Sequence, residues 1–364
     1  MPPLPENLDE SARWICQEMY QSYGCIPIAG GTVRSSELSA GASYTFWEPT
    51  MLILDADCSL KTLCCAGGLT IEGDAQFSSE VIYAACTGVL TVHSGTILCP
   101  VMDTPPEPDA ILNNGLCGFG GVTIKGGSVT CPEISGCSEM VVIDGGTVKA
   151  DAIHALFGYS QRGGDVEASY IWGREGVSIS DGTLTAGTIE GGMVGFYGGV
   201  SLVHKVTTEV GDSGLELSFP MVITEPSGAR YVDGVFIDEA GNPVEQVRIE
   251  KVSVDVPFTD ISGDAYYYNS VAWAVYKNIT SGVSETLFAP DRVCTRAQAM
   301  TFLWRASGSP KSEHLSLPFS DIEPGSYYAE AVCWAVENGI TKGTSENTFS
   351  PNRSCTRAEI ITFL

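Results

Sequence analysis

The feature that most restricts the fold of this chain is a short phrase that recurs between residues 25 and 190. It reads IPIAGGTVR at 26–34, LTIEGDAQF at 69–77, LTVHSGTIL at 90–98, VTIKGGSVT at 122–130, VVIDGGTVK at 141–149 and VSISDGTLT at 177–185. Each copy has a short alternating apolar strand, a turn of Gly, Asp or Ser, and a second short strand. Units of this size cannot bury their apolar faces alone, so they must stack on one another.

We therefore predict a mainly β chain, in which residues 25–200 form a right-handed parallel β-helix or a similar β-solenoid. In its general pattern of short strands and glycine turns, and without a diagnostic motif, this region resembles the Gly-rich β-helical regions of bacterial surface proteins. The alternative is an antiparallel sandwich with a hairpin at each Gly-Gly, because such pairs between strands also indicate hairpins. Residues 201–257 have strand-like segments separated by PSG and AGNP turns, and we predict a β-rich connector there.

The exposed strand edge at the start of a solenoid needs a cover. Residues 1–24 contain apolar side chains at helical spacing, which predicts an amphipathic helix that caps the first turn of the solenoid. The stripe consists of Leu8, Ala12, Ile15, Met19 and Tyr23.

Charge and composition exclude several classes of function. The net charge of −25 argues against a nucleic-acid partner, which would need basic patches. We find no run of 18 or more apolar residues, so no membrane span is expected. The first residues, MPPLPENLDESARW, lack the basic and apolar parts of a signal peptide.

The residues that usually carry chemistry are scattered. None of the 13 cysteines and four histidines has the spacing of a zinc site, and we expect no metal, cofactor or catalytic residue. The cysteines of the first region should mostly be small buried hydrophobic residues, although some of them could pair. They are Cys58, Cys64, Cys65, Cys86, Cys99, Cys117, Cys131 and Cys137.

The last part of the chain contains a second, longer repeat. Residues 258–310 match residues 319–364 without a gap, at an offset of 61 positions. Asp260 matches Asp321, Trp273 matches Trp334, Phe288 matches Phe349, Pro290 matches Pro351 and Arg296 matches Arg357. We predict two helices in each copy, with Trp273, Trp334, Phe288 and Phe349 in the core.

The second helix of each copy should begin at a capping box. Thr295 is followed three residues later by Gln298, and Thr356 is followed by Glu359. In this motif the hydroxyl accepts from the third backbone amide while the longer side chain bonds back to the cap. Such a rigid helix start would orient Arg296 and Arg357.

The pattern F-x-D, Y-x-x-x-V-x-W-A-V, G-I-T-x-G, F-x-P and T-R-A-E resembles the S-layer homology (SLH) repeat. The resemblance implies a non-catalytic module that anchors exported bacterial proteins by binding a secondary cell-wall polysaccharide, often with acidic pyruvyl groups. The polysaccharide-binding residues that it implies are the motif positions Thr295, Arg296, Gln298, Thr356, Arg357 and Glu359. Gln298 departs from the family Glu, so we expect the first copy to bind weakly or only to cap its helix. The second copy stops at Leu364 inside its last helix, so we expect a fragment of a longer extracellular, wall-associated protein.

Two questions remain open from the sequence. A guanidinium matches a carboxylate ligand, but Arg296 and Arg357 could instead pair with nearby residues and hold the module together. The solenoid could be a stalk or adhesive display region, a glycan-active lyase or hydrolase, or part of a structural S-layer subunit that associates with itself.

Overall fold

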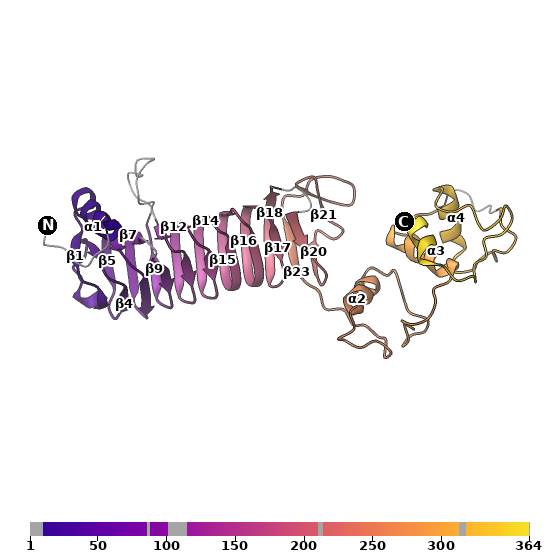
Figure 1. The fold of residues 1–364 in the computed structure, drawn as a ribbon, viewed down its shortest axis with the longest axis horizontal. Helices are drawn as coiled ribbons and strands as arrows, with labels where there is room; N and C mark the ends of the chain where they lie inside the picture. The colour runs from indigo at the N-terminus through magenta and orange to yellow at the C-terminus, as the bar shows by residue number, and fades with distance from the viewer. Residues whose placement is uncertain (1–9, 86–87, 101–114, 210–213, 313–317, 364) are drawn as a thin grey trace. The chain divides into compact units, whose positions relative to one another are not determined.

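The fold is that of a computed structural model, which describes residues 10–85, 88–100, 115–209, 214–312 and 318–363. The chain divides into two compact units, residues 1–252 and residues 253–364, and each is described by itself. The first unit is a parallel β-solenoid and the second is built from four short helices, so the predicted mainly β fold class is confirmed (Figure 1).

The solenoid strands pair in parallel from one turn to the next, which rules out the antiparallel sandwich. In chain order the parallel strands are β1 (Ile26–Ile28), β2 (Gly31–Arg34), β3 (Ser43–Phe46), β4 (Thr50–Leu54), β5 (Cys58–Cys65), β6 (Leu69–Gly73), β7 (Gln76–Ala84), β8 (Leu90–Val92), β9 (Thr96–Leu98), β10 (Gly115–Gly118), β11 (Val122–Ile124), β12 (Ser128–Gly136), β13 (Val141–Ile143), β14 (Thr147–Ala155), β15 (Tyr159–Gly173), β16 (Val177–Gly191), β17 (Val194–Phe196), β18 (Val200–Thr208) and β19 (Leu215–Leu217).

The solenoid core consists of columns of inward side chains. Ile134 in β12 aligns with Ile153 in β14, Ile171 in β15 and Ile189 in β16, and all four are fully buried. Their neighbours in sequence point outward because side chains alternate along a strand. The predicted burial of the cysteines is confirmed for those described, although Cys137 is only half-buried and Cys86 lies outside the described residues.

The recurring glycines form a column of their own at one corner of the solenoid. Gly146, Gly164 and Gly182 all have positive φ angles, of +80°, +74° and +85°. A Cβ atom added at Gly164 would lie 2.6 Å from the carbonyl oxygen of Gly146, and one at Gly182 would lie 2.3 Å from that of Gly164. Only glycine allows this close stacking of one turn on the next.

Both ends of the solenoid differ in detail from the sequence predictions. Parallel pairing continues past residue 200, because β18 aligns with β16 and β19 aligns with β17. The segment predicted as a connector then packs on the solenoid, where β23 (Val247–Lys251) runs antiparallel to both β18 and β20 (Met221–Glu225). A hairpin of β21 (Arg230–Val232) and β22 (Val235–Ile237) lies between β20 and β23 in sequence.

The N-terminal helix α1 (Glu10–Tyr23) covers more than the first strand edge. Met19 is buried in one cluster with Cys64, Val81 and Tyr83, which are outward-facing residues of successive turns. The helix therefore packs against the outer face of the first turns. Leu8 lies outside the described residues, as do the side chains of Ala12, Ile15 and Tyr23.

A hydrogen-bonded turn near this end leads to a pH prediction. The Ser36 backbone N–H donates to Asp55 Oδ1 at 3.0 Å, and this bond, with bonds from Ser36, Arg34 and Ser35 side chains, lowers the pKa of Asp55 to about 2. A depressed pKa stabilises the fold above the unfolded pKa of about 3.9, and the contribution is lost as the pH falls through about 2. Urea midpoints measured from pH 5 to pH 2 should therefore fall less for Asp55→Asn than for the wild type. Asp74→Asn, at an exposed carboxyl, should follow the wild type, and parallel curves for all three proteins would contradict the assignment.

Candidate functional site

The second unit contains the two sequence repeats, but its packing does not follow their boundaries. Its helices are α2 (Tyr268–Tyr276), α3 (Arg296–Ala306), α4 (Ala329–Glu337) and α5 (Arg357–Phe363). Helix α3 belongs to the first repeat in sequence, yet it packs on α4 of the second repeat (Figure 1). Met300 of α3 is fully buried in one cluster with Phe319, Val332 and Phe349 of the second repeat.

Local motifs fix the helix ends as the sequence predicts. At the start of α3, Gln298 N donates to Thr295 Oγ1 at 3.3 Å and Thr295 N donates to Gln298 Oε1 at 3.0 Å. Thr356 and Glu359 form the same reciprocal pair at the start of α5. Asn278 and Gly339, which follow α2 and α4, adopt the left-handed conformation that ends a helix, with φ angles of 56° and 71°.

An aspartate at the same position of each copy holds the loop that contains F-x-P. Asp260 accepts the backbone N–H groups of Phe288 and Ala289 at 2.9 and 2.7 Å. Asp321 accepts those of Phe349 and Ser350 at 2.8 and 2.7 Å. The first of these bonds, from Phe288, holds the pKa of Asp260 below its ordinary value. The loop geometry is therefore alike in both repeats.

The two arginines predicted to bind polysaccharide have different surroundings. Arg296 is only 3% exposed, and its Nε donates to the carbonyl oxygen of Phe349 at 2.9 Å while Nη2 donates to Thr341 Oγ1 at 3.4 Å. Its guanidinium carbon lies 4.8 Å from the centre of the Phe349 ring and 5.2 Å from that of Phe363. Burial lowers the pKa of Arg296. These contacts support the structural alternative for Arg296, because its donors face the protein interior.

Arg357 by contrast is exposed at the start of α5, and no described residue pairs with its side chain. Thr356 is exposed as well, while Glu359 is half-buried, pairs with Arg353 and lies 3.7 Å from Arg296 Nη1. The N–H of Thr356 holds the pKa of Glu359 below its ordinary value. Of the two predicted arginines, only Arg357 is accessible to a polysaccharide.

The predicted core residues also differ between the copies. Phe349 is fully buried and Trp334 is half-buried, as expected for the core of the second repeat. Phe288 is half-buried, and Trp273 is 41% exposed, which corrects its prediction as a core residue. The physical reason is that α3 covers the second repeat and no described helix covers α2 in the same way.

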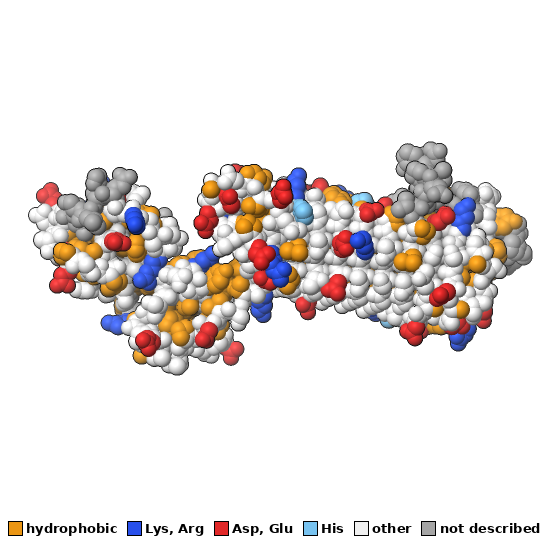
Figure 2. Space-filling model, turned by 180° about the vertical axis from the view of Figure 1, so that it is seen from behind, with side chains coloured by type: hydrophobic (Ala, Val, Ile, Leu, Met, Phe, Trp, Pro, Cys, Tyr) orange, Lys and Arg blue, Asp and Glu red, His pale blue; other side chains and the backbone are white. Residues whose placement is uncertain are grey.

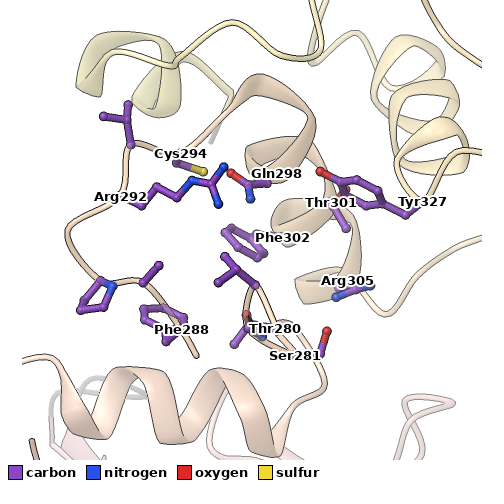
Figure 3. A pocket seen from close by; sticks show the side chains of 15 residues that line it. Thr280, Ser281, Phe288, Arg292, Cys294, Gln298, Thr301, Phe302, Arg305 and Tyr327 are labelled. Carbon is purple, nitrogen blue, oxygen red and sulfur yellow. Dashed lines mark hydrogen bonds between the residues drawn. The ribbon is translucent and has the colours of Figure 1, made fainter. Parts of the chain in front are cut away.

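A pocket of about 570 Å³ opens in the first repeat (Figure 3). Arg292 points into it beside Cys294 and Gln298, Phe302 and Phe288 line its floor, and Arg305 and Tyr327 lie on its other side. Arg305 Nη1 donates to the carbonyl oxygen of Ile279 at 3.2 Å, which fixes its position. Arg292 forms no ion pair with any residue that the structure describes.

The sequence analysis missed this pocket, although the repeat contains a signal for it. Arg353 in the second repeat pairs with Glu359, whereas the matching Arg292 has Gln298 beside it. Replacing Glu by Gln leaves Arg292 without the carboxylate that its counterpart has. The pocket thus presents an uncompensated positive charge in a chain whose net charge is −25. It is suited to a negatively charged group.

Comparisons with known proteins identify the repeats. The family model of the S-layer homology domain matches residues 257–300 and 318–361. The chain carries two S-layer homology domains, and these indicate association with the cell surface or cell wall. Among the described helices, none has the length and apolarity that crossing a bilayer requires.

Curated relatives match the chain over the same limited extent. A "Cell surface protein" of Thermoanaerobacter kivui is 32% identical over 114 residues, which are 30% of this chain and 15% of the relative. The "Surface-layer 125 kDa protein" of Lysinibacillus sphaericus is 36% identical over 109 residues, 29% of this chain and 9% of the relative. "Endo-1,4-beta-xylanase A" of Thermoanaerobacterium saccharolyticum is 31% identical over 105 residues, with the same shares of 29% and 9%. The chain thus spans a small part of these relatives, and no solved structure matches it.

Proposed function

We propose that residues 253–364 anchor a bacterial surface protein to the cell wall by binding an acidic polysaccharide in the pocket of the first repeat. The observation that carries the proposal is the unpaired Arg292 beside Gln298, in a module of the S-layer homology family. A guanidinium donates two parallel hydrogen bonds to a carboxylate, such as that of a pyruvyl group. Screening over about 8 Å at physiological salt lets this local charge act despite the acidic chain.

In this proposal the solenoid is a non-catalytic stalk or display region. On the face shown in Figure 2, most of its surface is backbone or side chains that are neither charged nor hydrophobic, with separate acidic, basic and hydrophobic side chains among them. The described residues contain no group of three or more metal-ligating side chains. This surface favours display over catalysis.

Two acids on the solenoid belong to one small cluster of hydrogen bonds and aromatic contacts. Glu133 Oε1 forms a hydrogen bond with His154 Nδ1 at 3.1 Å, and Glu190 accepts from the Tyr170 hydroxyl at 2.9 Å. The two acids lie on β12 and β16, with β14 and β15 between them. His154 on β14 and Tyr170 on β15 meet edge to face, with their ring centroids 5.7 Å apart. Both acids are therefore engaged by neighbouring side chains, which supports a structural role for them in the proposed display region.

Retention on purified cell-wall sacculi tests the binding proposal. Arg292→Ala should lower the affinity about 10- to 100-fold, because a hydrogen-bonded charge contributes about 1.5–3 kcal/mol. Gln298→Glu should also lower it, since the new carboxylate would pair with Arg292 and repel an acidic ligand. Lys277→Ala removes an exposed positive charge away from the pocket and should bind like the wild type.

Arg357→Ala belongs in the same assay, because Arg357 is the accessible arginine that the sequence predicts. Loss of retention in Arg357→Ala, with full retention in Arg292→Ala, would move the polysaccharide contact from the pocket to the start of α5. Full retention in both variants would exclude both arginines as the contact.

A further inference from the structure

Two cysteines on the outer face of the solenoid lie close enough to react with each other. Cys117 Sγ in β10 and Cys137 Sγ, one residue after the end of β12, are 3.2 Å apart. Because an S–S bond is about 2.05 Å long, the two sulfur atoms need to approach by only about 1.2 Å to form one. The sequence indicates that some of the cysteines could pair, and the structure brings these two together.

The stacking of two successive turns holds the sulfur atoms in place. Cys117 aligns with Ser135 in β12, and Cys137 follows Ser135 by two residues, so the side chains share one face. The backbone N–H of Cys137 also donates to the Gly118 carbonyl oxygen at 3.2 Å. The backbone beside both thiols is therefore already paired, and small movements of the side chains suffice to join the sulfur atoms.

The two thiols differ in a way that suits them to successive steps of an exchange reaction. Cys137 is half-buried, whereas Cys117 is buried in the same cluster as Met19 of α1. A hydrogen bond from the Cys117 thiol lowers the pKa of Cys137, and the same bond raises the pKa of Cys117. Because the thiolate is the nucleophile in thiol–disulfide exchange, Cys137 is suited to react first with a reagent from solvent.

We propose that Cys117 and Cys137 form a disulfide that joins two successive turns of the solenoid. The oxidant is a low-molecular-weight disulfide, such as glutathione disulfide. The Cys137 thiolate attacks one sulfur of this reagent, so a mixed disulfide forms and one glutathione thiolate leaves. Cys117 gives its proton to that thiolate and attacks Cys137 Sγ, which expels the second glutathione. The two protein thiols lose two electrons, and the reagent gains them to become two glutathione thiols, the second protonated by the proton that Cys137 released.

The cellular location and the chain topology give this bond a role. The S-layer homology domains indicate association with the cell surface or cell wall, and disulfides persist in oxidising environments outside the cytosol. The bond closes a loop over residues 117–137, which restricts the unfolded chain and so stabilises the first unit. The inference is independent of the polysaccharide pocket, because that pocket belongs to the other unit.

Peptide mapping of the full chain tests the proposal. The protein is reduced, freed of reductant and incubated in its native state with glutathione disulfide, and its remaining thiols are then alkylated. Cleavage after Glu133 and Glu139, without reduction, leaves Cys137 as the sole cysteine of residues 134–139. We expect this peptide to be joined through a disulfide to the peptide that contains Cys117, and fragment ions should locate the bond.

Three variants make the result specific. Cys137→Ser should abolish the link, and Cys117→Ser should leave Cys137 as a stable mixed disulfide with glutathione. Cys131→Ala removes an inward-facing cysteine of β12 and should keep the link at the wild-type yield. The oxidised wild type should unfold at a temperature at least about 5 °C above that of the reduced protein, and Cys137→Ser should lose this difference.

The map of the wild type decides the assignment without any variant. Complete alkylation of Cys137, a mixed disulfide that persists there, or a bond from Cys137 to another cysteine would each overturn the proposal. Equal unfolding temperatures of the linked and reduced wild type would overturn the stabilising role of the bond.

Discussion

Replacing Arg296 with Ala should destabilise the second unit by about 3 kcal/mol, a large share of the stability of a small domain. The change removes a buried guanidinium and leaves the Phe349 carbonyl and the Thr341 hydroxyl without their donor. A loss of this size should lower the midpoint of thermal unfolding by more than about 10 °C, as measured by calorimetry of the full chain. Arg296→Lys keeps the charge but loses the planar guanidinium. Its unfolding midpoint should therefore lie between those of the wild type and Arg296→Ala.

The repeat provides the matched control for this experiment. Arg357→Ala changes the same residue of the same motif, but at an exposed position, and should alter stability by less than about 0.5 kcal/mol. Equal losses in the two variants would show that burial between the repeats does not determine the role of Arg296.

The second large effect is expected in the solenoid, from Gly164→Ala. The new Cβ would lie 2.6 Å from the carbonyl oxygen of Gly146, and the φ angle of +74° is itself costly for any residue with a Cβ. The backbone conformation alone should cost about 1–2 kcal/mol. With the close contact added, the first unit should be destabilised by about 3–5 kcal/mol. Calorimetry should show the shift in a different transition from the one that Arg296→Ala moves.

Gly41→Ala separates the two causes. Gly41 has a similar φ angle of +76°, but an added Cβ there meets no atom within 4 Å. Its loss should be limited to about 1–2 kcal/mol, the cost of the backbone conformation. If Gly164→Ala cost no more than Gly41→Ala, the contact between stacked turns would not limit the choice of residue.

The sequence predicts the solenoid because its signals are local. Alternating strands around 122–149 and the glycines between them specify both the buried column and the turn, and the structure contains both. The length of the stack is less local. Parallel pairing of β18 and β19 depends on the preceding turns, and the sequence after residue 200 has no matching phrase.

The candidate site is harder to predict because identical motifs have different environments. Arg296 and Arg357 follow the same capping Thr, but only the first meets another repeat and becomes buried. The sequence shows that Gln298 in the first repeat stands where the second repeat has Glu359. The effect of this difference on Arg292 depends on a loop and a helix that are brought together by folding. Side-chain identity therefore predicts the available chemistry, while packing decides which groups remain accessible.

The packing of α3 on α4 means that the sequence repeat and the packed structural unit have different boundaries in this module. A gene segment cut between residues 310 and 319 would encode one repeat without the helix that completes it, and another with a helix that has nothing to cover. Recombination that preserves the module should therefore exchange segments that begin before Arg296 and keep it joined to Phe349. Deletion series and chimeras of such proteins should place their junctions ahead of the helix rather than at the apparent end of the repeat.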